Sequence, residues 1–151
     1  MPIPDIIPDI SHAIQLALAP VFLLTGIAGL LNVMTNRLAR IIDRARYFEE
    51  RWSGLDESTR KTLNDELANL ERRRHLASRA INASTFAALL VCMVVATLFV
   101  EVLLNLPLKW LAGLLFIGSM AALIGGLTVF LREVYLATHT VRFVTTAPKS
   151  E

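Results

Sequence analysis

Residues 10–36 read ISHAIQLALAPVFLLTGIAGLLNVMTN, which is 27 residues without Asp, Glu, Lys or Arg. Two further stretches, 80–100 and 110–131, are equally free of these residues and contain 21 and 22 positions. An α-helix rises about 1.5 Å per residue and the hydrocarbon core of a bilayer is about 30 Å thick, so each stretch is long enough to cross a membrane. The sequence therefore predicts an all-α integral membrane protein with three transmembrane helices.

The composition of the whole chain agrees with this prediction. Hydrophobic residues make up 54% of the 151 positions, and the mean hydropathy is +0.54. A soluble domain of this length needs a more polar surface than that composition allows. We therefore expect a single membrane domain covering residues 1–151.

The distribution of basic residues predicts the orientation. The first 36 residues contain no Lys or Arg, whereas eleven Lys or Arg and eight Asp or Glu lie between Arg37 and Arg79. Short loops rich in Lys and Arg stay on the cytoplasmic side, and acidic residues have little influence. The segment 37–79 is expected inside, the N-terminus outside and the C-terminus, with Arg132, inside.

Helical periodicity continues past the first charge-free stretch. Leu38, Ile41 and Ala45, and later Leu67 and Leu70, recur at helical spacing among charged residues. This pattern predicts that the first two spans extend into a cytoplasmic antiparallel coiled-coil hairpin. The expected segments are spans at about 11–36, 80–104 and 109–131, the hairpin at about 37–79, and a C-terminal helical extension at about 132–144.

The first span has a polar face that suggests function. Its members recur every seven residues or at the intervening positions: Gln15, Phe22, Thr25, Gly29, Asn32 and Asn36. Such a face is costly against lipid, so it should meet another helix or water. Two interpretations remain open, namely an interface in which these residues pack against another helix, and a pore lined by the first helix in a ring of subunits.

The N-terminal segment repeats Pro-Asp-Ile around Asp5 and Asp9. In an oligomer, rings of these two carboxylates would attract cations to an external mouth. The alternative is that Asp9 only caps the first helix. No set of three ligands with fixed spacing occurs, so the sequence predicts no metal site and no cofactor.

Small residues mark a packing face on the third span. Gly118, Ala122 and Gly126 are each four residues apart, and Gly125 belongs to a second such row. Small residues at this spacing let helix backbones approach closely. We expect this face to contact a neighbouring helix of the same chain or of another subunit.

The charged segment 37–79 suggests nucleic acid or anionic lipid as a partner. Acidic residues alternate with the basic ones throughout it, which favours ion pairs on a solvated surface over nucleic-acid binding. Arg37 and Arg79, at the two ends of the segment, remain candidates for contacts with lipid headgroups. No nucleic acid is expected as a partner.

No arrangement of residues typical of an enzyme is present. The three histidines lie in different regions, the single Cys92 lies within a span, and no Gly-rich phosphate loop occurs. We therefore expect a protein without catalytic activity.

The segment 11–20, SHAIQLALAP, with Leu31-Asn32 and Asn36-Arg37-Leu38, resembles an uncharacterised bacterial family of small three-span membrane proteins. The likeness extends over most of the chain and is strongest in the first helix. That family is catalogued as a domain of unknown function. The resemblance implies a bacterial inner-membrane location and three helices, and it implies no activity and no catalytic residues.

Three functions are compatible with these features. The leading hypothesis is a homo-oligomeric small-ion channel lined by the first helix, with cations as the transported ions. Its rival is a non-conducting scaffold or regulator that acts through the hairpin. A third is an accessory subunit of a larger enzyme or transporter. Self-association is expected because three spans leave a polar face and a small-residue face that need partners.

Overall fold

The computed structural model describes residues 6–50 and 57–140, and these residues form three helices. Helix α1 covers Ile6–Glu50, α2 covers Glu57–Leu104 and α3 covers Lys109–Thr140. The prediction of an all-α fold with three long helices is confirmed. Residues 51–56, which include the expected turn of the hairpin, and 141–144, the end of the expected C-terminal extension, lie outside the described part.

The helices are longer than a membrane crossing requires. They contain 45, 48 and 32 residues, so α2 alone is about 72 Å long, more than twice the roughly 30 Å of bilayer hydrocarbon. Each helix contains a window that is long and apolar enough to cross a membrane. This agrees with a multi-pass membrane protein whose first two helices extend well beyond the bilayer.

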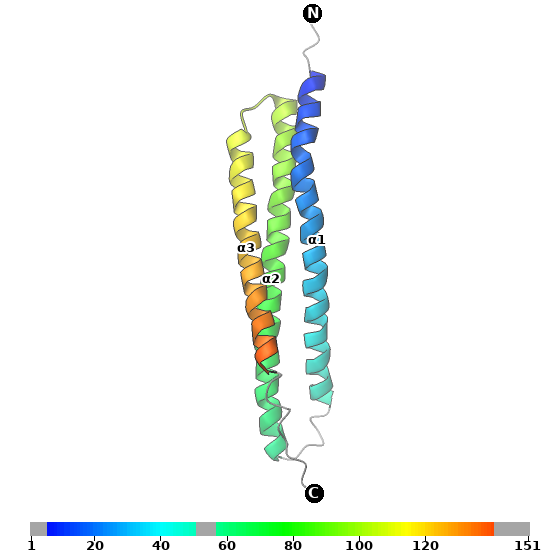
Figure 1. Cartoon of the computed structure of the whole chain (residues 1–151), viewed down its shortest axis with the longest axis vertical. Helices are drawn as coiled ribbons and strands as arrows, with labels where there is room; N and C mark the ends of the chain where they lie inside the picture. Colours follow the sequence, from blue (N-terminus) through cyan, green and yellow to red (C-terminus); the bar gives the residue numbers. More distant parts are fainter. Residues whose placement is uncertain (1–5, 51–56, 141–151) are drawn as a thin grey trace, which may run out of the picture.

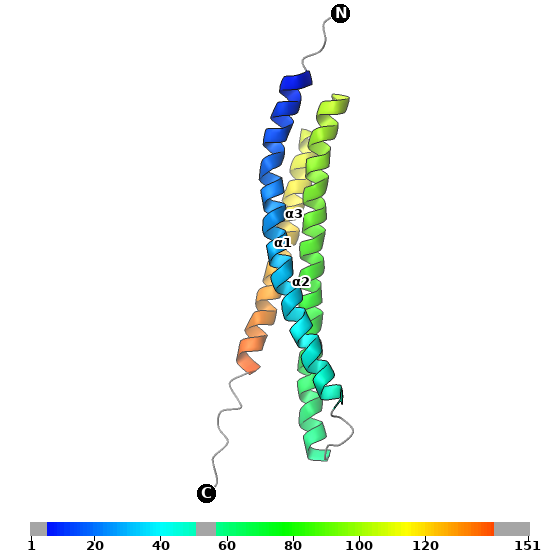
Figure 2. The ribbon, with the colours of Figure 1, turned by 90° about the vertical axis from the view of Figure 1, so that its right-hand side faces the viewer.

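Helix α2 is the central element, because it packs against both α1 and α3 (Figure 1). The turned view shows that α1 and α2 continue side by side below the end of α3 (Figure 2). Between these two helices Ile41, Leu70 and Ala77 form a buried cluster, with Leu38 and Ala45 packed against it. The two longest helices thus share one antiparallel interface that continues beyond the apolar region.

The buried positions of each helix repeat every seven residues, the spacing expected where helices pack almost parallel along a narrow seam. On α1 the buried positions are Ala13, Pro20, Ile27, Met34 and Ile41, with Ala17 between the first two. On α2 they are Leu70, Ala77, Ser84 and Val91, with Ala80, Ala87 and Val94 between them. On α3 they are Ala112, Ser119, Gly126 and Glu133.

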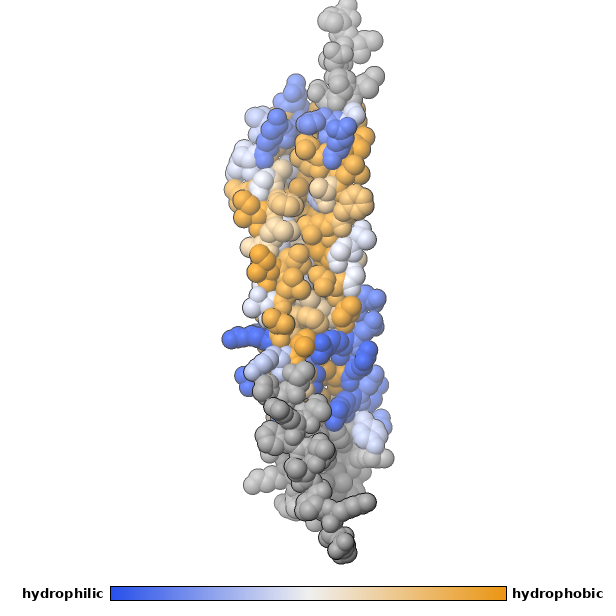
Figure 3. Space-filling model, viewed as in Figure 1, coloured by the Kyte–Doolittle hydropathy of each residue, from blue (hydrophilic) through white to orange (hydrophobic). Residues whose placement is uncertain are grey.

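Large apolar side chains cover the outside of the bundle. Phe22, Ile117 and Leu131 are each about 70% exposed, with relative exposures of 73%, 69% and 69%. Figure 3 shows that such residues form a continuous band, bounded by hydrophilic residues above and below. A soluble protein rarely leaves so large an apolar surface in water, so this band is the surface that suits contact with lipid.

The connection between α2 and α3 is short and well defined. Asn105 has φ of 52°, and the amide of Leu106 donates to the carbonyl of Glu101 over 3.2 Å. This 6→1 hydrogen bond is typical of a Schellman motif at the C-terminal end of a helix. Asn105 occupies the left-handed position of the motif, where Asn is the usual substitute for Gly. Pro107 follows and prevents the helix from continuing.

Candidate functional site

The six residues of the predicted polar face lie on the side of α1 that faces away from α2. Each of them is two positions along the chain from a buried residue of α1; Gln15, for example, follows the buried Ala13 by two positions. Two positions correspond to a rotation of about 200° around a helix, which is nearly the opposite side. All six are exposed in the single chain: Gln15, Phe22, Thr25, Gly29, Asn32 and Asn36. A Cβ added at Gly29 would meet nothing within 4 Å.

Hydrogen bonds on this face stay within α1. The hydroxyl of Thr25 donates to the carbonyl of Val21 over 3.4 Å, and the amide of Asn36 donates to the side-chain oxygen of Asn32 over 3.3 Å. Among the described residues, no side chain of α2 or α3 hydrogen-bonds to the face. The remaining hydrogen-bond donors and acceptors of this face are therefore available to water or to another molecule.

The expected external carboxylates can be placed only in part. Asp5 lies outside the described residues. Asp9 lies in the first turns of α1, and its side chain is outside the described part. The proposed ring of carboxylates therefore remains a prediction.

The small residues of α3 divide between two sides of the helix. Gly126 is buried, and a Cβ built on it would lie 2.9 Å from Ser84 Oγ and 3.2 Å from the Ala80 carbonyl oxygen. The next residue, Gly125, is exposed, and a Cβ there would meet nothing within 4 Å. Gly118 and Ala122 are half-buried, with Gly118 near Leu90. Gly126 thus marks the close contact between α2 and α3.

Ser84 connects all three helices at this level. Its side chain is fully buried, and its hydroxyl lies 3.8 Å from the sulfur of Met34 on α1. Its oxygen is also the atom closest to a Cβ added at Gly126. The three helices therefore come close together where Met34, Ser84 and Gly126 meet.

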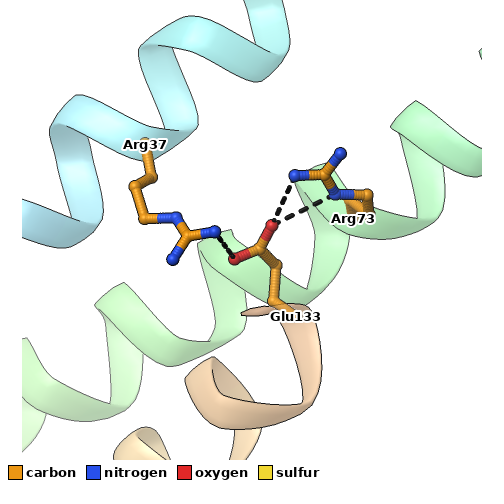
Figure 4. A network of polar contacts seen from close by, with 3 residues as sticks. All are labelled: Arg37, Arg73 and Glu133. Atoms are coloured by element: carbon orange, nitrogen blue, oxygen red, sulfur yellow. Dashed lines mark hydrogen bonds and ion pairs between the residues drawn. The ribbon is translucent and has the colours of Figure 1, made fainter. Parts of the chain in front are cut away.

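A cluster of three charged side chains joins the helices at the end of the apolar region. Glu133 of α3 is completely buried, and its Oε1 accepts hydrogen bonds from Nε and Nη2 of Arg73 over 3.1 and 2.9 Å. Its other oxygen, Oε2, lies 3.6 Å from Nη2 of Arg37 on α1 (Figure 4). The cluster Arg37–Arg73–Glu133 therefore contains one residue from each helix.

The two arginines are bound differently. Arg73 forms two hydrogen bonds with one carboxylate oxygen, whereas the 3.6 Å contact of Arg37 is too long for a hydrogen bond. Oε2 of Glu133 has no hydrogen-bond partner. The Cζ atom of Arg37 lies 5.4 Å from the centre of the Phe130 ring, within the range of a cation–π contact.

Sequence reasoning identified Arg37 as a headgroup candidate, treated Arg73 only as part of the charged segment 37–79, and missed Glu133. A signal was present, because Ala112, Ser119 and Gly126 continue at seven-residue spacing to Glu133. A packing face of small residues that ends in a carboxylate indicates that the carboxylate is buried and needs a cationic partner. The second headgroup candidate, Arg79, is exposed on α2.

The lower part of the bundle contains one further recess. A groove of about 340 Å³ lies between α1 and α2 and is lined by Ile41, Ile42, Ala45, Arg46, Leu67, Leu70, Glu71 and Arg74. The lining combines apolar side chains with the charged Arg46, Glu71 and Arg74. In the described ranges, 6–50 and 57–140, no three His, Cys, Asp or Glu residues lie close enough to hold a metal ion.

Comparison with known protein families gives a match over most of the chain. The family model described as "Protein of unknown function (DUF2721)" matches residues 17–143, which include the charge-free stretches 80–100 and 110–131 entirely and the first one from residue 17 onward. No curated protein and no solved structure matches the chain.

Proposed function

The chain belongs to the DUF2721 family of proteins of unknown function, and we propose from its own structure that it is a homo-oligomeric inner-membrane protein that conducts small cations. In this proposal, α1 of each subunit lines the central axis. The transported cations pass along the face formed by Gln15, Thr25, Asn32 and Asn36. The protein acts without a cofactor and without catalysis.

The observation that carries the proposal is the exposure of polar side chains at membrane depth. Thr25 and Asn32 are exposed on the side of α1 away from α2, although they belong to a helix apolar enough to span the bilayer. An asparagine facing lipid is unfavourable, whereas one facing water or another subunit is not. A ring of subunits with α1 at the centre would give these residues a polar environment.

The topology that fits this function places the N-terminus outside the cell. The Lys and Arg residues of segment 37–79 favour retention of this segment in the cytoplasm. The lower parts of α1 and α2 then form a cytoplasmic antiparallel hairpin, and the carboxylates of Asp5 and Asp9 lie at the external mouth. There they would raise the local concentration of cations.

A non-conducting scaffold is the second candidate, and a specific observation favours it. Thr25 and Asn36 already form hydrogen bonds within α1, so the polar face needs less water than its sequence suggests. In a scaffold the face would be a dry subunit interface, and the groove between α1 and α2 would offer the hairpin a surface for a partner.

Ion flux through the purified protein in liposomes tests the proposal. Wild type should conduct cations, Asn32→Leu should abolish the flux, and Asp9→Asn should weaken it for cations. Thr128→Leu is the matched control, because Thr128 is also an exposed polar residue in a span but lies on α3; it should conduct like wild type. No flux from wild type would favour the scaffold.

The oligomer can be tested independently of conduction. Crosslinking in native membranes should return a ladder of homo-oligomers. Recovery of the monomer alone would remove the basis of both candidate functions.

A further inference from the structure

Arg37 carries a positive charge that Glu133 does not balance. The carboxylate of Glu133 is already bound by two hydrogen bonds from Arg73. Arg37 contributes only a 3.6 Å contact, and its side chain forms no hydrogen bond within the described residues. The cluster holds two guanidinium groups and one carboxylate, so it retains one positive charge in excess.

The surroundings of Arg37 add to this charge. Arg40, three residues after Arg37 on α1, is also exposed. Glu133 is the only acidic residue of α3, and α1 has no acidic residue between Asp9 and Asp43. An anion that approaches Arg37 from outside the bundle therefore meets a positive potential.

The position of Arg37 matches the level of lipid phosphates. It is the first charged residue after the charge-free stretch 10–36. Phe130, which lies beneath its guanidinium, is the second-last residue of the charge-free stretch of α3. The side chain is 32% exposed, so part of it is packed against the bundle and part is accessible from outside. Arginines at the end of a membrane span commonly place their aliphatic part on apolar surface and their guanidinium group at the membrane boundary.

Figure 4 shows one nitrogen of Arg37 facing Glu133 while another points away from it. A guanidinium group can bind a phosphate through two parallel N–H···O bonds, which an ammonium group cannot do. We propose that Arg37 binds the phosphate of an anionic phospholipid in the leaflet next to the hairpin. Arg73 remains on Glu133, and the nearby carboxylate limits the strength of this lipid site.

Native mass spectrometry of the detergent-solubilised protein tests this site. Palmitoyl-oleoyl phosphatidylglycerol should be retained in preference to the phosphatidylcholine of the same chains by about fivefold, the selectivity that one basic residue near the surface supplies. Arg37→Gln should abolish the preference, and Arg37→Lys should reduce it. Arg132→Gln removes the same charge one residue from Glu133 and should preserve most of the preference.

Glu133→Gln separates a lipid site from a loss of structure. Removal of the carboxylate frees Arg37 from its internal anion, so this variant should retain more phosphatidylglycerol than wild type, an effect that misfolding does not produce. Unchanged selectivity in Arg37→Gln, or lower retention in Glu133→Gln, would overturn the proposal. Displacement of the lipid by excess inorganic phosphate would also overturn it, in favour of a free phosphate ligand. The result is independent of ion flux, so this site and the proposed function can fail separately.

Discussion

Glu133 of α3 and Arg73 of α2 are 60 positions apart in the sequence, and two N–H groups of Arg73 meet one carboxylate oxygen of Glu133 at 2.9 and 3.1 Å. The carboxylate is completely buried, whereas 22% of the Arg73 side chain is exposed. Removal of one partner therefore has a different cost for each of the two that can remain. A buried carboxylate without Arg73 cannot be solvated by water, whereas Arg73 without the carboxylate can be.

Arg73→Gln should destabilise the protein more than Glu133→Gln. Loss of Arg73 leaves a buried charge with only a long contact to Arg37, which costs about 3 kcal/mol or more. Loss of the Glu133 charge leaves two partly exposed arginines and costs about 1 kcal/mol. The free energy of unfolding, measured by denaturant titration in mixed micelles with tryptophan fluorescence, checks the order.

The double variant Arg73→Gln with Glu133→Gln is the control for this comparison. Because it contains no unpaired buried charge, it should be more stable than Arg73→Gln alone. Equal stability of the two single variants would mean that Glu133 reaches water when Arg73 is absent.

Gly126→Ala should weaken the contact between α2 and α3. The added Cβ would lie 3.2 Å from the backbone oxygen of Ala80 and 2.9 Å from Ser84 Oγ, so the helices must separate slightly, at a cost of about 1 to 3 kcal/mol. Gly125→Ala is the matched control, because a Cβ there meets nothing within 4 Å and alanine favours the helix. If both variants unfold at the same denaturant concentration, α3 does not pack through Gly126.

The three helices could be predicted from the sequence because a long charge-free stretch leaves few alternatives. The backbone of such a stretch must satisfy its own hydrogen bonds in a bilayer, and a helix does so within a single segment. The continuation of α1 and α2 was also visible, since Ile41 and Leu70 keep the helical spacing after the charges begin. They meet in one buried cluster in the structure.

The partners within the site could not be predicted in the same way. Gly125 and Gly126 belong to equally regular rows of small residues, and only the rotation of α3 against α2 distinguishes them. Glu133 was missed because it lies directly beside Arg132 in a segment that reads as a solvated helix end. The pairing of Glu133 with Arg73 depends on how far α3 is shifted along α2, and the spacing of residues in the sequence does not specify this shift.

Labelling of single cysteines from one side of the membrane should establish the orientation. Asn64 and Lys109 are both exposed; Asn64 lies near the beginning of α2, and Lys109 is the first residue of α3, just after the connection at the far end of α2. With Cys92 replaced by serine, a membrane-impermeant maleimide should label Lys109→Cys in intact cells whose outer membrane is permeabilised, and Asn64→Cys only in inverted vesicles. The reverse pattern would place the hairpin outside, against the distribution of Lys and Arg.

Thiol accessibility along α1 should distinguish a conducting axis from a dry interface. Cysteine at Asn32 or Asn36 should react with a water-soluble methanethiosulfonate reagent in the membrane-embedded protein, because a thiol must ionise to react and ionises only where water is present. Cysteine at Leu114, which is 59% exposed on α3, should stay unreactive, since its surroundings are lipid.

The buried position Ile27, on the opposite side of α1, supplies the second control and should also stay protected. Reaction at Asn32 and Asn36 with protection at both controls means that water follows the polar face and not the helix as a whole. Uniform protection would exclude a water-filled axis along α1, because packing against another subunit and contact with lipid both keep water away from a thiol. Uniform protection together with crosslinked oligomers would therefore indicate a dry interface between subunits, whereas protection of a monomer would mean that the face meets lipid.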